Sequence, residues 1–212
     1  LVRRRKHFQR NCIMPKVSIV TSYFNRKSQF MRTLSSIRAS EEKDIEIVVV
    51  DDGSSDEHRL EDVEGIKLVR LEPEGKWYVN PCIPFNRGFA EATGDIIILQ
   101  NPECLHIGDV ISHAAKNVTD DNYISYSCYS FDEFITERLP DKINRDNFDS
   151  LLSIIPNLPQ VQPAAGNCGW YNHPEVKPTA YHFTSAITKK NLDSLGGFDE
   201  SFANGIGFDD DE

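Results

Sequence analysis

The chain has 212 residues, of which 39% are hydrophobic, 10% aromatic and 26% charged, and its formal net charge is −10. This composition excludes a disordered chain and suffices for one large domain with its own hydrophobic core. Residues 1–13 contain five basic side chains and no acidic ones, so residues 14–212 carry a net charge of −15. We predict no nucleic-acid partner, because neutralising phosphates requires a basic surface.

Residues 1–13 precede Met14-Pro15-Lys16, which is typical of a natural start. We interpret these 13 residues as either a cloning remnant or an upstream extension, and we exclude them from the fold. No apolar run approaches the roughly 20 residues that span a bilayer, so we predict no transmembrane segment. The five cysteines are scattered without a Cys-x-x-Cys pair, which predicts free thiols and a cytoplasmic location.

The first half of the chain alternates between apolar strand-like runs and helical segments. Strands are expected over residues 17–23, 45–50, 66–71 and 95–99. A helix with Asn25 or Ser28 as its cap is expected after the first strand, and a second helix over residues 84–93. This alternation predicts an α/β fold with a mostly parallel central sheet flanked by helices, in which ligands bind at the carboxyl ends of the strands.

The pattern changes after residue 107. A helix is expected near residues 110–115, a strand over 123–129 and another helix over 148–155. Residues 130–180 are rich in Pro, Asn and Asp, and long polar segments of this kind are often functional loops.

Polar clusters follow two of the expected strands. Asp51 and Asp52 precede Gly53 in a loop where carboxylates can accept from a nucleobase or a ribose hydroxyl. The alternative is an Asp-Gly turn with helix-capping carboxylates. After the fourth strand, Glu103 offers a hard oxygen ligand for a divalent cation, and Asn101 offers a carbonyl. The alternative there is a turn built around Pro102.

Three further segments have both a functional and a structural interpretation. Asn86 and Arg87 are expected at a helix N-terminus that faces a diphosphate, or else as a cap and a surface arginine. Trp170 and His173, in a loop, either stack on a sugar or anchor the loop. The acidic run over residues 209–212 follows glycines, and its clustered carboxylates suit a general base; the alternative is a solvated terminus.

Taken in order, these motifs resemble family 2 glycosyltransferases, which have a GT-A fold with a Rossmann-like nucleotide-binding half. The resemblance rests on residues 15–26, 48–56, 86–95 and 196–200. It implies an inverting, hexosyltransferase-like enzyme of polysaccharide biosynthesis. Such an enzyme moves a sugar from a nucleoside diphosphate, with a UDP-sugar the preferred candidate, to a glycan or other acceptor hydroxyl, with manganese or magnesium. The alternative is a non-catalytic nucleotide-sugar-binding domain.

The resemblance also implies roles for individual residues. Residues 14–212 form the glycosyltransferase domain, with a nucleotide-sugar-binding half over 14–106 and an acceptor-side half over 107–212. Asp210, with Asp209, is the expected catalytic base, Glu103 the expected metal ligand, and Trp170 and His173 bind the acceptor. The nucleotide is expected to contact Thr21, Tyr23, Asn25, Asp51, Asp52 and Asn86.

Two departures from the family pattern bear on these roles. Residues 100–103 replace an Asp-x-Asp metal motif and retain Glu103 as the one carboxylate. The family also continues past the acid pair, so we expect an incomplete acceptor-side half and a truncated catalytic domain.

Overall fold

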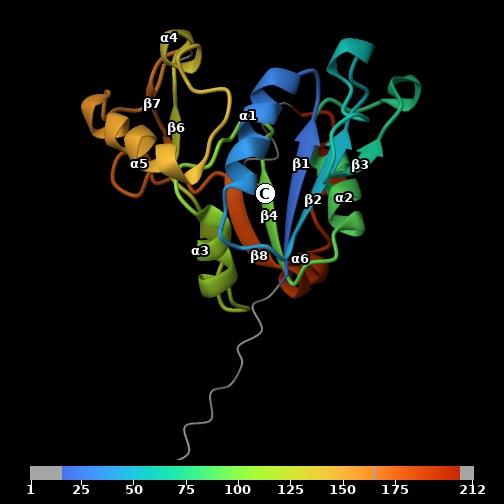
Figure 1. The fold of residues 1–212 in the computed structure, drawn as a ribbon. Coiled ribbons are helices and arrows are strands. Elements are labelled where there is room, and N and C mark those ends of the chain that lie inside the picture. Colours follow the sequence, from blue (N-terminus) through green and yellow to red (C-terminus); the bar gives the residue numbers. More distant parts are fainter. Residues whose placement is uncertain (1–15, 165, 206–212) are drawn as a thin grey trace, which may run out of the picture.

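A computed structural model describes residues 16–164 and 166–205 of the chain. Its main sheet has the strand order β3-β2-β1-β4-β8-β5 (Figure 1). Four of these strands are mutually parallel: β1 (Val17–Tyr23), β2 (Ile45–Asp51), β3 (Lys67–Arg70) and β4 (Ile96–Gln100). The sheet continues with β8 (Thr184–Thr188), which pairs antiparallel with β4. The edge strand β5 (Ile124–Ser125) pairs antiparallel with β8. The predicted mostly parallel sheet is confirmed.

Helices cover both faces of this sheet, which is why its central strands are nearly continuous apolar runs. On one face, α1 (Lys27–Arg38) and α3 (Val110–Asn117) bury Phe30, Leu34, Ile37 and Ile111 against β1, β2 and β4. On the other face, α2 (Cys82–Glu91) and α6 (Lys189–Leu195) bury Phe85, Phe89 and Leu192. The sheet is therefore the middle layer of three (Figure 1).

A smaller unit lies beside the main sheet. It contains a two-stranded sheet of β6 (Cys128–Ser130) and β7 (Gly169–Asn172), with α4 (Glu133–Thr136) and α5 (Arg145–Ile154) (Figure 1). Leu139, Phe148 and Leu151 form its core, which packs against Leu105 and Ile107 after β4. Short 3₁₀ helices occur at Asp56–His58 (η1), Pro73–Gly75 (η2), Ile155–Asn157 (η3) and Glu200–Phe202 (η4).

The strand predicted over residues 123–129 is wrong as a single element. Its first part, β5, pairs with β8 of the main sheet, whereas its second part, β6, pairs with β7 of the small sheet. Residues 170–172, predicted as loop, belong to β7. Both differences arise because strand pairing here joins residues about 40 to 60 positions apart, which local patterning does not report.

The two predicted helix starts also differ. Neither Asn25 nor Ser28 caps α1, because its N-cap is Arg26, which makes no capping hydrogen bond with its side chain. The second helix, α2, begins at Cys82, whose N–H donates to the side-chain oxygen of Asn80. Proline is tolerated in a first helical turn, so Pro84 does not mark the start. Asn86 and Arg87 consequently lie inside α2, away from its N-terminus.

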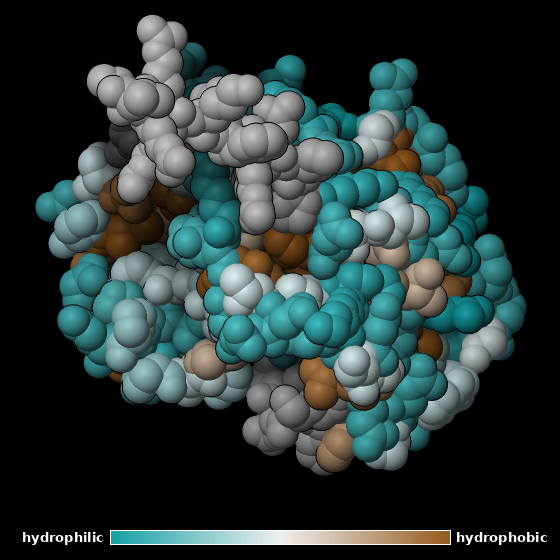
Figure 2. All heavy atoms as spheres, turned by 90° about the horizontal axis from the view of Figure 1, so that it is seen from below, coloured by the Kyte–Doolittle hydropathy of each residue, from teal (hydrophilic) through white to brown (hydrophobic). Residues whose placement is uncertain are grey.

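The edge of the sheet at the amino ends of the parallel strands is viewed from below in Figure 2. Hydrophilic residues dominate this face, and hydrophobic residues gather in small separate patches. No helix among the described residues is long and apolar enough to cross a membrane.

Candidate nucleotide-sugar site

The carboxyl ends of β1, β2 and β4 meet at one edge of the main sheet because the three strands are adjacent and parallel. The chain leaves β1 first towards β2 on one side and later returns to β4 on the other. In open α/β sheets, ligands bind outside the strand ends at such a reversal. We call this place, bordered by residues 24–26, 52–54 and 101–103, the crevice.

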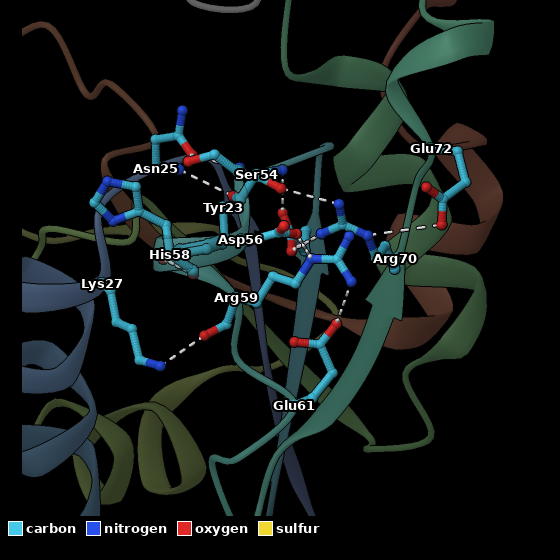
Figure 3. Close-up of polar contacts among 12 residues, drawn as sticks. Tyr23, Asn25, Lys27, Ser54, Asp56, His58, Arg59, Glu61, Arg70 and Glu72 are labelled. Carbon is cyan, nitrogen blue, oxygen red and sulfur yellow. Dashed lines mark hydrogen bonds and ion pairs between the residues drawn. The ribbon is translucent and has the colours of Figure 1, made fainter.

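Asn25 joins the first two of these segments. Its backbone N–H donates to Ser54 Oγ at 3.0 Å, and its side-chain oxygen accepts from the N–H of Ser55 at 2.9 Å (Figure 3). Asn25 has φ +52°, a left-handed conformation that asparagine tolerates better than most residues. This predicted nucleotide-binding residue thus fixes the loop after β1 against the loop after β2.

Asp51 is fully buried, and both of its carboxylate oxygens have internal partners. One accepts from Arg70 Nη1 at 2.6 Å and the other from the N–H of Ser54 at 2.9 Å. Arg70 also donates to the carbonyl of Ser54 and forms an ion pair with Glu72 (Figure 3). These contacts are those of a carboxylate that fixes the conformation of the loop after β2. They agree with the alternative interpretation of Asp51 as part of an Asp-Gly turn.

Asp52 lies nearer the surface, with its side chain 11% exposed. It accepts from the Tyr78 hydroxyl at 2.6 Å and pairs with Lys76 Nζ at 2.5 Å. Burial and the neighbouring Asp52 charge raise the pKa of Tyr78, which therefore stays a proton donor. Lys76 also lies over the ring of Phe24, which is half exposed. Asp52, Lys76, Tyr78 and Phe24 form a polar and aromatic wall, which we call the β2-side wall.

Thr21 and Tyr23 point into the protein. Thr21 is buried within β1, and the Tyr23 ring is packed against Phe30 with its hydroxyl donating to the carbonyl of His58 at 2.6 Å. Burial raises the pKa of Tyr23 to about 12. Neither side chain faces the crevice, so any contact of theirs with a nucleotide would come from the backbone.

Glu103, the predicted metal ligand, forms an ion pair with Arg26 at 3.0 Å across the crevice between β1 and β4. Both side chains are substantially exposed. Within residues 16–164 and 166–205, no group of three or more His, Cys, Asp or Glu side chains is placed to hold a metal ion.

Asn86 connects α2 to the segment after α6. Its side-chain oxygen accepts from the N–H of Phe198 at 2.8 Å, and its amide nitrogen donates to the Phe198 carbonyl at 2.9 Å. A Cβ on Gly197 would overlap the Asn86 side chain, so only glycine permits this approach. The Asn86 amide thus holds the backbone that leads towards the acidic run.

The chain beyond Phe198 passes close to the β2-side wall. The N–H groups of Val79 and Asn80 donate to the carbonyl of Ala203, and the Asn80 side chain donates to the carbonyl of Gly205. Since Val79 follows Tyr78, the last described residues lie beside the wall that holds Asp52. Asp209 and Asp210, the predicted catalytic residues, are outside the described residues.

A cavity of about 600 Å³ opens between the main sheet and the small sheet. Its lining includes Glu103 after β4, Arg32 of α1, Tyr129 of β6 and Trp170 of β7. The predicted acceptor residue Trp170 therefore shares a cavity with the predicted metal ligand. His173 does not line it; its Nδ1 accepts from two backbone N–H groups of the following turn, and its ring packs against Trp170.

Several residues of the site were not singled out from the sequence. Lys76 and Tyr78 flank the exposed Trp77, and a lysine that follows a glycine and precedes two aromatic residues is a usable signal for a binding wall. No sequence motif surrounds Arg70 in β3 or Arg32 in α1. Their roles depend on residues that only the fold brings next to them.

The chain is similar to known proteins both in sequence and in structure. A 90-residue stretch is 34% identical to an uncharacterized glycosyltransferase, alr2836, of Nostoc sp., and covers 39% of this chain and 26% of that protein. A mannosyltransferase of Pyrobaculum calidifontis, PcManGT, solved with GDP-Man and Mn²⁺, matches with a TM-score of 0.55 at 18% identity. That match covers 94% of this chain and 50% of the mannosyltransferase.

S. aureus TarS, residues 1–349, matches with a TM-score of 0.52 at 15% identity, over 92% of this chain and 52% of that one. Its complex with UDP matches with a TM-score of 0.50. The chain thus spans about half the length of these structures, whose likeness shows the GT-A fold. The sequence model of glycosyl transferase family 2 matches residues 18–172, nearly three quarters of the chain. The chain belongs to glycosyl transferase family 2.

Proposed function

We propose that this chain carries the donor site and the catalytic base of an inverting glycosyltransferase, which moves a sugar from a nucleoside diphosphate to an acceptor hydroxyl. The observation that carries the proposal is the crevice at the carboxyl ends of β1, β2 and β4. It has the β2-side wall on one side, and on the other side Glu103, which also lines the cavity that contains Trp170. Donor and acceptor would then meet at one edge of the sheet.

The nucleoside would lie against the β2-side wall. Phe24 offers an exposed ring for stacking, and Asp52 offers acceptor oxygens if the donor displaces Lys76 or Tyr78. Support for a nucleotide-sugar donor comes from the related structures, which hold GDP-Man in one case and UDP in another. We retain a UDP-sugar as the preferred donor for this chain. The free thiols of Cys104, Cys128 and Cys168 agree with the reducing, cytoplasmic environment that we propose.

The described residues do not by themselves fit a divalent cation. Glu103 would be the one carboxylate ligand and is already neutralised by Arg26, and no cluster of three ligating side chains exists in this part of the chain. Arg26 places a guanidinium next to the crevice, and a departing diphosphate that displaced Glu103 from it would have its negative charge offset there. We derive no step through a metal.

In the reaction we propose, a carboxylate oxygen of Asp210 takes the proton of the acceptor hydroxyl while the hydroxyl oxygen attacks the anomeric carbon. The bond from that carbon to the diphosphate oxygen breaks on the opposite face, so the configuration inverts and the electron pair leaves with the nucleoside diphosphate. Docking of Ala203 and Gly205 beside the β2-side wall supports this role, because Gly205 precedes Asp209 by only four residues in the sequence.

The replacement Asp210→Asn tests the proposal. A thermal-shift screen of GDP- and UDP-sugars first identifies the donor, and transfer and donor hydrolysis are then measured. We expect turnover to fall at least about a hundredfold, the scale of a lost general base, with donor affinity unchanged. Asp211→Asn is the matched control and should retain activity. Normal turnover in Asp210→Asn would remove that residue from the mechanism.

The pairing of Glu103 with Arg26 also favours a second candidate, a domain that binds a nucleotide sugar without catalysis. Binding of a nucleotide sugar with neither transfer nor hydrolysis, in the wild-type chain with and without Mn²⁺, would favour that candidate over the enzyme.

A further inference from the structure

The cavity between α1 and the small sheet has walls suited to a sugar or another ring. Tyr129, Phe131, Trp170 and Tyr171 all line it, and aromatic faces are the usual platform for ring stacking. We call it the acceptor cavity. Its volume of about 600 Å³ falls within the range of small-molecule sites in proteins.

Arg32 lines this cavity and lacks an adequate partner. Its side chain is 18% exposed, and its buried Nε has no hydrogen-bond partner among the described residues. The single ion pair joins its Nη2 to Asp141 at 3.9 Å, and that aspartate is fully exposed to water. A buried N–H of a guanidinium without a hydrogen bond is unfavourable, and native proteins normally supply a partner.

A second polar group beside Arg32 has the same deficit. Thr33 is fully buried, also lines the cavity, and its hydroxyl has no hydrogen-bond partner among the described residues. Two neighbouring residues of α1 that line the cavity therefore each hold a buried polar atom without a hydrogen bond. A ligand with several oxygens would satisfy them.

The charge balance of the cavity determines which ligand fits. Arg32 and Glu103 are its charged lining residues, and Glu103 is neutralised by Arg26. His106 also lines the cavity, but burial lowers its pKa to about 4, so it is neutral at physiological pH. The uncompensated charge in the described part of the cavity is the positive charge of Arg32.

We propose that the acceptor cavity selects ring-containing acceptors that carry an oxyanion, a carboxylate or a phosphate, and that Arg32 is the residue that recognises this group. The inference rests on the proposed function in so far as the cavity is taken as the acceptor side. Arginine binds carboxylate and phosphate through paired N–H donors, whereas neutral acceptors would leave the guanidinium unpaired.

The donor diphosphate is a weaker candidate for the same charge. Arg32 lies five residues after the start of α1, about 8 Å along the helix axis from Lys27 and hence from the carboxyl edge of the sheet. Asp52 and Lys76, against which we place the nucleoside, lie on the β2 side of β1, whereas the cavity opens on the β4 side.

The test compares pairs of probes that differ in charge. Phenyl β-D-glucuronide is compared with phenyl β-D-glucoside, and phenyl phosphate with phenol, by saturation-transfer NMR titration against the wild-type chain. We expect the charged member of at least one pair to bind about tenfold more tightly, which is the scale of one charge-assisted hydrogen bond. Preference within the sugar pair alone identifies a carboxylate, and preference within the phenyl phosphate pair alone identifies a phosphate.

Variants of α1 locate the effect. Arg32→Gln should abolish the preference for the charged probe, and Arg32→Lys should retain part of it. Arg38→Gln, on the same helix but bonded to the Glu64 carbonyl outside the cavity, should behave as the wild type. Circular dichroism and thermal unfolding verify that each variant is folded, and the probe comparison in the wild type needs no variant.

Three results would overturn the proposal: equal binding of both members of each pair or no binding by any probe, an unchanged preference in Arg32→Gln, or a loss of GDP and UDP affinity in Arg32→Gln. The last would assign Arg32 to the donor diphosphate. Wild-type chain that binds neither nucleotide but keeps an Arg32-dependent preference for the charged probe would contradict the proposed function and leave this inference standing.

Discussion

The acidic side chains at the carboxyl edge of the sheet differ in their partners, and this difference separates their roles. Asp51 is fully buried and held by Arg70 and Ser54, so it shapes a loop. Asp52 is buried but lies nearer the surface, bonded to Lys76 and Tyr78, and we place the nucleoside against it. Glu103 is exposed and paired with Arg26.

The Arg26–Glu103 pair leads to a prediction about metal affinity. Arg26→Gln removes the cation that competes for the Glu103 carboxylate, so Mn²⁺ should bind about two- to fivefold more tightly, the scale of an exposed ion pair. Electron paramagnetic resonance of free Mn²⁺ measures this directly. The gain should disappear in the double variant Arg26→Gln, Glu103→Gln, and equal affinity in all three proteins would contradict the competition.

A second prediction at this scale concerns the buried His106, whose ring bonds to Gln100 Oε1 at 2.8 Å. Burial lowers its pKa from 6.5 to about 4, so between these pH values the unfolded chain binds a proton that the folded chain does not. Above pH 6.5 the protonation of His106 therefore does not lower the free energy of unfolding. As the pH falls from 6.5 towards 4, the free energy of unfolding decreases by about 3 kcal/mol in all.

Urea unfolding at a series of pH values measures that loss. His106→Gln retains a donor for Gln100 and should show a correspondingly shallower fall in stability between pH 6.5 and 4. The exposed His113 is the matched control, and His113→Gln should follow the wild-type curve. A wild-type slope in His106→Gln would mean that other groups cause the loss.

At the scale of elements, the close packing of α2 on β1 and β2 depends on a single glycine. A Cβ on Gly88 would overlap Val20 and come within 3.1 Å of Val50. This contact sets how closely α2 approaches the sheet. The same helix contains Asn86, which forms two hydrogen bonds with the backbone of Phe198.

Gly88→Ala should therefore destabilise the protein by about 1–3 kcal/mol, because overpacking outweighs the gain in helix propensity. Gly75→Ala is the control: no atom lies within 4 Å of its Cβ position, and its unfolding free energy should change by less than about 0.5 kcal/mol. Urea unfolding compares the two, and equal stability would show that α2 shifts freely on the sheet.

At the scale of the whole molecule, the two halves of the predicted domain share one sheet. The strand β8, from the second half, pairs along all of β4 from the first half, and Ile111 and Ala186 complete the core around β1. The division at residue 106 therefore separates ligand-binding surfaces more than folding units.

A fragment of residues 14–106 should accordingly fail to fold alone, since it exposes the edge of β4 and the apolar face that α3 covers. Size-exclusion chromatography and thermal melting by circular dichroism would compare it with residues 14–212. We expect association and no cooperative melting in the fragment. A monomeric, cooperatively melting fragment would show that the first half is autonomous.

The elements of the first half could be predicted because their signals are local. Apolar runs predicted β1, β2 and β4 to within a residue or two, and the helix expected after the first strand is α1. The second half was predicted less well: β8 and α6 were not foreseen, and residues 123–129 divided between two sheets. Their placement depends on pairing between distant segments, for which a short sequence window has no signal.

The candidate site divides in the same way. By itself the sequence determined the family of the chain and the loops in which we place its chemistry, because strand ends, glycines and carboxylates are encoded locally. Only the tertiary structure decided that Asp51 faces Arg70, that Glu103 faces Arg26, and that Arg32 lies beside an aromatic cavity with its Nε unbonded. These relations join residues brought together by strand order, and the burial and charge that fix their roles exist only after that assembly.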